Sequence, residues 1–200
     1  IVQEVLNVVL RIPAETHIMV RYIGIQLVGE LCKWIEKHPQ ALEPVLQFLL
    51  AGLQNSDVST VAAKALQRIC EQCNEQMTSH LDGLIQVLRA VDTFNVTNDA
   101  ALELIKGTVI ILSQLPHAQI TTGMRQMCAM QAEPLMKIIA EEAGTPIPGV
   151  PQRDPAVWLD RLAAVFRSCS PKVKHGKVHP CQSVIMETWP VLSSTCEKYQ

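Results

Sequence analysis

Two short patterns in this 200-residue chain contain residue types that can bind metal ions or attack substrates. Cys70 and Cys73 have the spacing of a zinc-ligand or redox pair, but no second Cys or His pair lies at zinc-finger distance and the surrounding residues predict a helix. His179 and Cys181 flank Pro180, with no evident carboxylate to orient a histidine base. We therefore predict that Cys70 and Cys73 pack in a helical core, and that the chain has no catalytic, metal or cofactor-binding residues.

Other features of the sequence support a protein that is not an enzyme. The glycine-rich loops that bind phosphates and the motifs of zinc proteases and serine hydrolases are missing. Seven cysteines, an odd number, are scattered along the chain, which argues against a disulfide framework and for a reducing compartment. No apolar run approaches the roughly 18 residues of a membrane span. We expect a cytosolic or nuclear protein.

The central element is a helix predicted to start after Asn55, Ser56 and Asp57, which offer oxygen atoms as N-terminal caps. Its apolar residues recur at steps of three and four, so they share one face. These residues are Val58, Val61, Ala62, Ala65, Leu66, Ile69 and Cys73. The alanines on this face allow another helix to approach closely. One helix cannot bury such a face alone, so we expect it to be one layer of a repeated structure.

Similar patterns predict further helices over residues 1–11, 14–37, 40–53, 75–91, 97–115 and 118–142, and from 154 and about 180, with a kink or split at Pro134. The second helix of each pair starts near residues 14, 58, 97 and 154. A spacing of about 40–47 residues is the HEAT/armadillo period. We predict an all-α fold, an α-α superhelix or HEAT/armadillo-like solenoid of antiparallel helix pairs without a β-sheet. A compact helical bundle is the alternative.

The predicted domain organisation is one continuous segment over residues 1–200, with about four to five repeats. A proline-rich stretch at residues 143–153 is predicted to be a loop insertion. Ile1 begins directly in an apolar helical pattern, and the sequence stops straight after another one. We therefore expect a fragment of a longer chain.

The net charge of −2 is unevenly distributed. Residues 1–152 contain 10 basic and 15 acidic side chains, whereas residues 153–200 contain 7 and 4. The basic excess near the C-terminus is either a weak patch for acidic partners or a solvated helix end. The moderate overall charge argues against nucleic-acid binding.

Several runs of the sequence resemble the importin-β (karyopherin) family, in the branch that imports serine/arginine-rich splicing factors. They include residues 20–31, 38–40, 154–167 and 179–185, and the resemblance extends along essentially all 200 residues. It implies a nuclear import receptor that shuttles between cytoplasm and nucleus. Such a receptor binds cargo with phosphorylated Arg-Ser-rich domains, contacts nucleoporins in the pore, and releases cargo when Ran GTPase binds in its GTP form.

In this family the second helix of each repeat lines the concave surface, where cargo and Ran bind. The resemblance therefore suggests that the basic residues of the predicted second helices face cargo, although these side chains are equally expected on an ordinary solvated face. The candidates are Arg21, Lys64, Arg68, Lys106, Arg161 and Arg167. Phosphate groups would favour the arginines, which can bind them through two parallel hydrogen bonds. A HEAT-repeat scaffold that organises a multiprotein complex is the alternative function.

Overall fold

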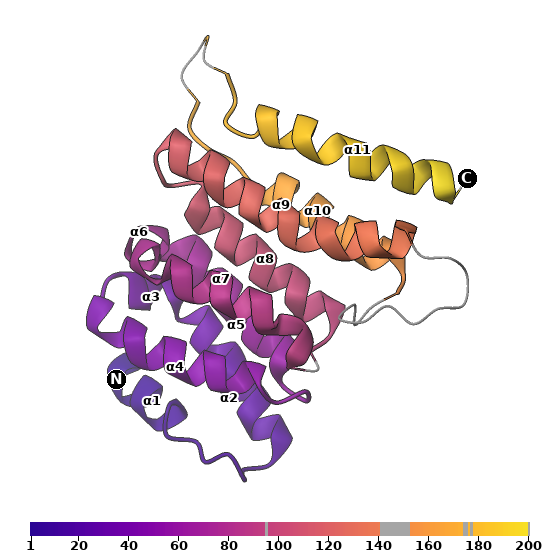
Figure 1. Cartoon of the computed structure of the whole chain (residues 1–200). Coiled ribbons are helices and arrows are strands. Elements are labelled where there is room, and N and C mark those ends of the chain that lie inside the picture. The colour runs from indigo at the N-terminus through magenta and orange to yellow at the C-terminus, as the bar shows by residue number, and fades with distance from the viewer. Residues whose placement is uncertain (95, 141–152, 174–175, 177, 200) are drawn as a thin grey trace. The chain divides into compact units, whose positions relative to one another are not determined.

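The regular elements of the chain are helices. The computed structural model describes residues 1–94, 96–140, 153–173, 176 and 178–199, and no strand occurs among them (Figure 1). The all-α prediction is confirmed, and the helices are consistent with a HEAT-like repeat. The chain divides into two compact units, residues 1–111 and residues 112–200.

The first unit contains most of the helices. They are α1 (Val2–Val9), α2 (Ile18–Glu30), α3 (Cys32–Glu36), α4 (Leu42–Leu53), α5 (Ser59–Gln72), α6 (Asn74–Met77), α7 (Leu81–Ala90) and α8 (Asn98–Leu112). Short 3-10 turns connect some of them, at Pro39–Ala41, Thr78–His80 and Val91–Thr93. The predicted helices over 40–53 and 97–115 are confirmed, and Thr97 caps α8 by accepting a hydrogen bond from the N–H of Ala100 at 3.2 Å.

Helix α5 is the centre of this unit, as its apolar face predicts. It packs against both α2 and α4. All seven of its predicted core residues are buried, with at most 5% of their surface exposed. The helix whose pattern suggested a repeated layer is thus the one around which the unit is built.

Small residues let the neighbouring helices approach α5 closely. A Cβ atom added to Gly29 of α2 would lie 3.1 Å from the Cα of Ala65, and one added to Gly107 of α8 would lie 3.2 Å from the Cα of Gln67. Both distances are shorter than ordinary van der Waals contact, and the backbone atoms involved cannot move aside cheaply. Ala65 therefore allows close approach of a second helix, as expected, but this approach also requires glycine in the facing helix.

Two predicted helix starts differ from the structure. The helix expected from Ala14 begins at Ile18, because residues 13–16 form a turn in which the N–H of Thr16 donates to the carbonyl of Pro13 at 3.1 Å. The cap expected for α5 is also wrong. Asn55 accepts a hydrogen bond from the N–H of Asp57 at 3.0 Å, and the N-cap residue is Val58, which has no side-chain cap. The polar residues form a turn before the helix instead of capping it.

The helix predicted over 14–37 is also interrupted. The N–H of Leu31 hydrogen-bonds to the carbonyls of both Leu27 and Val28, at 3.1 and 3.2 Å, which tightens the turn between α2 and α3. Similarly, the helix predicted over 75–91 is divided into α6, a 3-10 turn and α7. Breaks of one turn leave the spacing of apolar residues almost unchanged, which is why periodicity did not reveal them.

The second unit contains three long helices among its described residues. They are α9 (His117–Ala140), α10 (Pro155–Ser168) and α11 (Gln182–Lys198), and α9 packs against both of the others. α10 starts where the helix from 154 was predicted, and Asp154 caps it by accepting a hydrogen bond from the N–H of Ala156 at 2.9 Å. α9 continues through Pro134, so of the predicted kink or split the split does not occur. The proline-rich loop, apart from Arg153, lies outside the described residues.

The apolar residues of α11 are not all buried. Ile185, Trp189 and Cys196 are exposed, and 60% of the Trp189 surface is accessible. The buried positions are Val184, Thr188 and Thr195. Each threonine hydroxyl donates at 2.7 Å to the carbonyl four residues earlier, which satisfies its polar group and lets the methyl group pack inward.

Candidate protein-binding surfaces

The basic residues predicted in the first unit lie on α2, α5 and α8. Lys64 and Arg68 are one turn apart on the exposed face of α5, opposite its buried apolar face. Arg21 of α2 is half-buried beside a small pocket of about 110 Å³, and Lys106 of α8 is also half-buried. These four side chains are therefore at least partly accessible.

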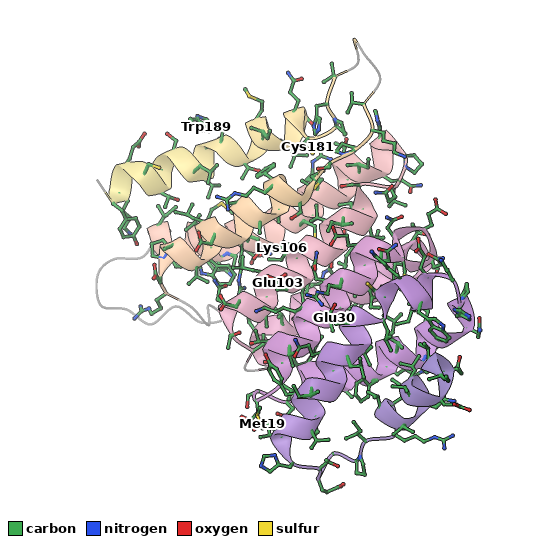
Figure 2. The ribbon with its side chains drawn as sticks, turned by 180° about the vertical axis from the view of Figure 1, so that it is seen from behind. Met19, Glu30, Glu103, Lys106, Cys181 and Trp189 are labelled. Carbon is green, nitrogen blue, oxygen red and sulfur yellow. The ribbon has the colours of Figure 1, made fainter. Side chains whose placement is uncertain are left out.

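Two of these cations pair with carboxylates of the same unit. Arg68 donates to Glu30 at the end of α2, and this hydrogen bond raises the pKa of Arg68 above its usual value, so the guanidinium stays charged. Lys106 donates to Glu103 at 2.9 Å within α8. Glu30, Glu103 and Lys106 lie on one face of the unit in Figure 2. The surface is therefore mixed in charge and not a uniformly basic patch.

Further polar contacts join the α2–α3 region to α5 and α6. The amide of Gln72 donates to the Glu36 carboxylate at 2.7 Å, and that of Gln76 donates to the Glu36 carbonyl at 3.3 Å. Together with the pair formed by Arg68 and Glu30, these bonds join successive helices along one edge of the unit. The exposed pair of Arg68 with Glu30 contributes little stability, but it leaves Arg68 less available to a partner.

The two candidates of the second unit have very different environments. Arg161 is only 3% exposed, and its guanidinium carbon lies 4.7 Å from the ring centroid of Trp158 in a cation–π contact. Arg167 is exposed in the last turn of α10, where a positive charge suits the negative end of the helix dipole. Arg161 is therefore part of the packed interior of this unit, whereas Arg167 is accessible.

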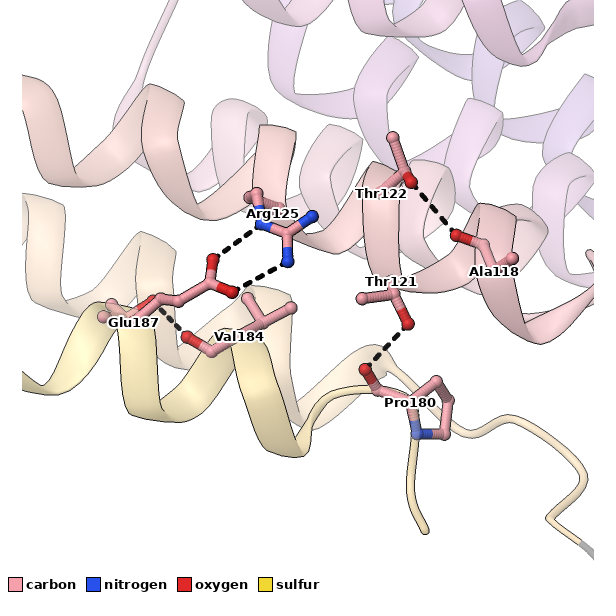
Figure 3. Close-up of polar contacts among 8 residues, drawn as sticks. Ala118, Thr121, Thr122, Arg125, Pro180, Val184 and Glu187 are labelled. Carbon is pink, nitrogen blue, oxygen red and sulfur yellow. Dashed lines mark hydrogen bonds and ion pairs between the residues drawn. The ribbon is translucent and has the colours of Figure 1, made fainter. Parts of the chain in front are cut away.

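The second unit contains an ion pair between α9 and α11 that was not predicted. Arg125 of α9 binds Glu187 of α11 through two hydrogen bonds, from Nε at 2.6 Å and from the terminal nitrogen at 2.7 Å (Figure 3). The same two helices are also joined near their starts by Thr121, which donates to the carbonyl of Pro180 at 3.0 Å. Nothing in the sequence pairs residues this far apart, because the pairing requires α9 and α11 to be neighbours.

The cysteines that suggested chemistry lie in the packed interior. Cys70 and Cys73 are each 1% exposed, and burial raises the pKa of both thiols, that of Cys73 to about 11. Cys181 is buried too, with a pKa of about 12, and His179 accepts a hydrogen bond from its backbone N–H, not from its thiol. A catalytic cysteine acts as the thiolate, so none of these three thiols is in the environment of a catalytic nucleophile. The described residues contain no cluster of metal-binding side chains.

The first unit also has an apolar pocket between α4 and α7. Its volume is about 250 Å³, and the residues around it include Leu46, Leu50, Met77, Leu84 and Val87. Gly83 borders the same pocket, and a Cβ atom there would meet nothing within 4 Å. The pocket is large enough to receive one apolar side chain from a partner.

Residues 1–87 match the family model described as the Transportin-3/Importin-13 third TPR domain. These residues are similar to a helical-repeat segment of that family. The match covers most of the first unit, including α5 and the pocket between α4 and α7. It supports the predicted importin-β relationship at the level of this family, without separating transportin-3 from importin-13.

Individual relatives extend the similarity beyond the matched segment. An uncharacterized protein of Schizosaccharomyces pombe is 25% identical over 185 residues, which is 90% of this chain and 19% of the relative. The mRNA transport regulator MTR10 of Saccharomyces cerevisiae is 24% identical over 182 residues, 88% of this chain and 18% of the relative. Transportin MOS14 of Arabidopsis thaliana is 24% identical over 149 residues, 70% of this chain and 15% of the relative.

The chain thus spans less than a fifth of the length of these relatives. The matched family model and two of the relatives carry the names of transport proteins. Among the described residues, no helix is both long enough and apolar enough to cross a bilayer.

Proposed function

We propose that this chain is part of a nuclear transport receptor that carries serine/arginine-rich cargo and releases it when RanGTP binds. The match of residues 1–87 to the transportin-3/importin-13 family is the observation that carries this proposal. The transport functions in the names of the yeast and plant relatives support it. A receptor of this kind shuttles between cytoplasm and nucleus, binds no nucleic acid directly and does not insert into membranes.

The accessible cations of the second helices are the proposed cargo contacts in this segment. Lys64 and Arg21 are the first choice in the first unit, because Arg68 and Lys106 already have carboxylate partners. Arg167 is the first choice in the second unit. Arg161 is buried beside Trp158 and does not belong to this surface. A phosphorylated Arg-Ser segment would gain charge-assisted hydrogen bonds at the arginines.

The test is the affinity of the full-length protein for a phosphorylated Arg-Ser domain, measured with and without RanGTP. Tight binding that RanGTP abolishes is the expected result. Lys64→Glu should weaken cargo binding and its dependence on salt, because it reverses a charge on the proposed surface. Arg89→Glu is the control, since Arg89 is exposed on α7, a first helix, and should leave the affinity unchanged.

Nucleoporins are the other partners implied by the family, and the pocket between α4 and α7 is where we propose that one binds. Gly83→Leu should fill this pocket without displacing a neighbour and weaken binding to nucleoporin repeats. Cargo affinity should not change. Equal nucleoporin binding by the variant and the original protein would show that this pocket is not the site.

A HEAT-repeat scaffold is the second candidate function. The mixed charge of the surface formed by α2, α5 and α8 favours it, because Glu30 and Glu103 neutralise two of the cations offered to cargo. If the full-length protein binds neither phosphorylated Arg-Ser domains nor RanGTP, the scaffold function replaces the receptor.

A further inference from the structure

Two thiols of the second unit are in direct contact. The sulfur atoms of Cys169 and Cys181 lie 3.2 Å apart. Cys169 follows the last residue of α10, and Cys181 precedes the first residue of α11. The pair therefore spans the short connection between these two helices.

The geometry is close to that of a bonded pair. A disulfide holds its sulfur atoms at about 2.05 Å, so the two atoms must approach by only about 1 Å. Cys169 lies outside the helix, with extended backbone angles (φ −83°, ψ 102°), and Cys181 is the N-cap residue of α11. Neither residue lies in a helix interior, so small side-chain and backbone rotations can supply this movement.

The two thiols differ in a way that assigns them separate roles. Cys169 is half-buried, and the hydroxyl of Ser113 donates to its sulfur at 3.7 Å. Cys181 is only 3% exposed, and burial raises the pKa of its thiol. Cys169 is therefore the sulfur that meets an oxidant first, and Cys181 is placed to react with it afterwards.

We propose that Cys169 and Cys181 form a reversible disulfide when a hydroperoxide oxidises this protein, which ties the end of α10 to the start of α11. The Cys169 sulfur attacks one oxygen of hydrogen peroxide, the O–O bond breaks, and the thiol proton leaves with the other oxygen, so that a sulfenic acid and water are formed. The sulfur of Cys181 then attacks the sulfenic sulfur, and the hydroxyl group leaves as water with the Cys181 proton. Two thiols lose two electrons in total, and the peroxide is reduced to two waters.

The bond would act on the connection between the helices. Residues 170–180, which include the exposed Lys172, would become a closed ring with fewer accessible conformations in the unfolded chain. Oxidation should therefore stabilise the second unit. In reducing compartments such bonds are typically transient and sense redox state, and a reducing thiol would restore both cysteines.

The test is disulfide mapping of the full-length protein after hydrogen peroxide treatment, alkylation and tryptic digestion. Cleavage places Cys169 in the peptide 168–172 and Cys181 in the peptide 178–198. The expected product is these two peptides joined, lighter by two hydrogen atoms than their sum and separated by dithiothreitol. Cys196 lies in the second peptide, so the experiment uses a Cys196→Ser protein, in which the link must persist.

Two further variants complete the design. Cys181→Ser and Cys169→Ser should each abolish the link, and the oxidised Cys196→Ser protein should melt at a higher temperature without reductant than with it. The proposal is overturned if peroxide leaves both peptides singly alkylated while Cys196 of the unsubstituted protein, treated in parallel, is oxidised. A link from Cys169 to the buried Cys128, in place of Cys181, would overturn it equally.

Discussion

Arg125 and Glu187 form a two-bond ion pair between α9 and α11, with nitrogen–oxygen distances of 2.6 and 2.7 Å. The parallel geometry matches the planar guanidinium to the carboxylate and makes the pairing specific. Because both side chains are about half-exposed, the pair serves more to align the two helices than to stabilise them.

This pair predicts a pH dependence of stability. The Arg125 guanidinium lowers the pKa of the Glu187 carboxyl below its ordinary value of 4.5, so the folded state favours the charged form. Its stabilising contribution is therefore complete above the unfolded pKa and is lost as pH falls through the lower folded value. Glu187→Gln should unfold more easily in urea at pH 7, and the difference from the original chain should shrink in acid. A difference that stays constant with pH would contradict this.

Two glycines at helix positions should respond in opposite ways to alanine. Gly83→Ala should stabilise the chain by about 0.5–1 kcal/mol, because its Cβ meets nothing within 4 Å and alanine favours the helix. Gly107→Ala should destabilise it by about 1–3 kcal/mol, because its Cβ would lie 3.2 Å from the Cα of Gln67. Urea unfolding of both variants checks this. Equal shifts would mean that α8 does not pack closely on α5.

The core of the first unit should be sensitive at α5. Leu66 is 1% exposed, so Leu66→Ala should lower the unfolding free energy by about 2–5 kcal/mol through lost burial and a cavity. Lys64→Ala, two residues earlier on the exposed face, is the matched control and should change it by less than about 0.5 kcal/mol. Thermal or urea unfolding distinguishes the two variants. Similar losses of unfolding free energy would mean that Leu66 does not lie on the buried face of α5.

Arg161 and Arg167, both on α10, allow a buried and an exposed arginine to be compared. Arg161→Ala should destabilise the second unit by about 2 kcal/mol, because it removes a desolvated cation–π contact with Trp158. Arg167→Ala should have little effect on stability, since its side chain is exposed. If Arg167→Glu lowers cargo affinity while its unfolding curve is unchanged, the lost affinity is due to the changed surface charge and not to unfolding. A stable Arg161→Ala protein would contradict the packing described here.

Helix content and the face of α5 follow from the sequence alone, because a period of 3.6 residues places Val61, Ala65 and Ile69 on one side whatever they pack against. The Asp154 and Thr97 caps were predictable for a similar reason, since each acts within its own first turn. Local geometry needs no knowledge of neighbouring helices.

The remaining features depend on which helices meet. Arg161 and Arg167 are alike in sequence, yet only the tertiary structure buries one against Trp158 and leaves the other exposed. Three other features depend on packing in the same way. Thr188 is buried where Trp189 is exposed, Cys169 contacts Cys181, and Arg125 pairs with Glu187. The sequence determined a helical protein with an apolar face on α5, whereas packing decided which charged and sulfur-containing side chains are accessible, because exposure is a property of neighbours and not of residue type.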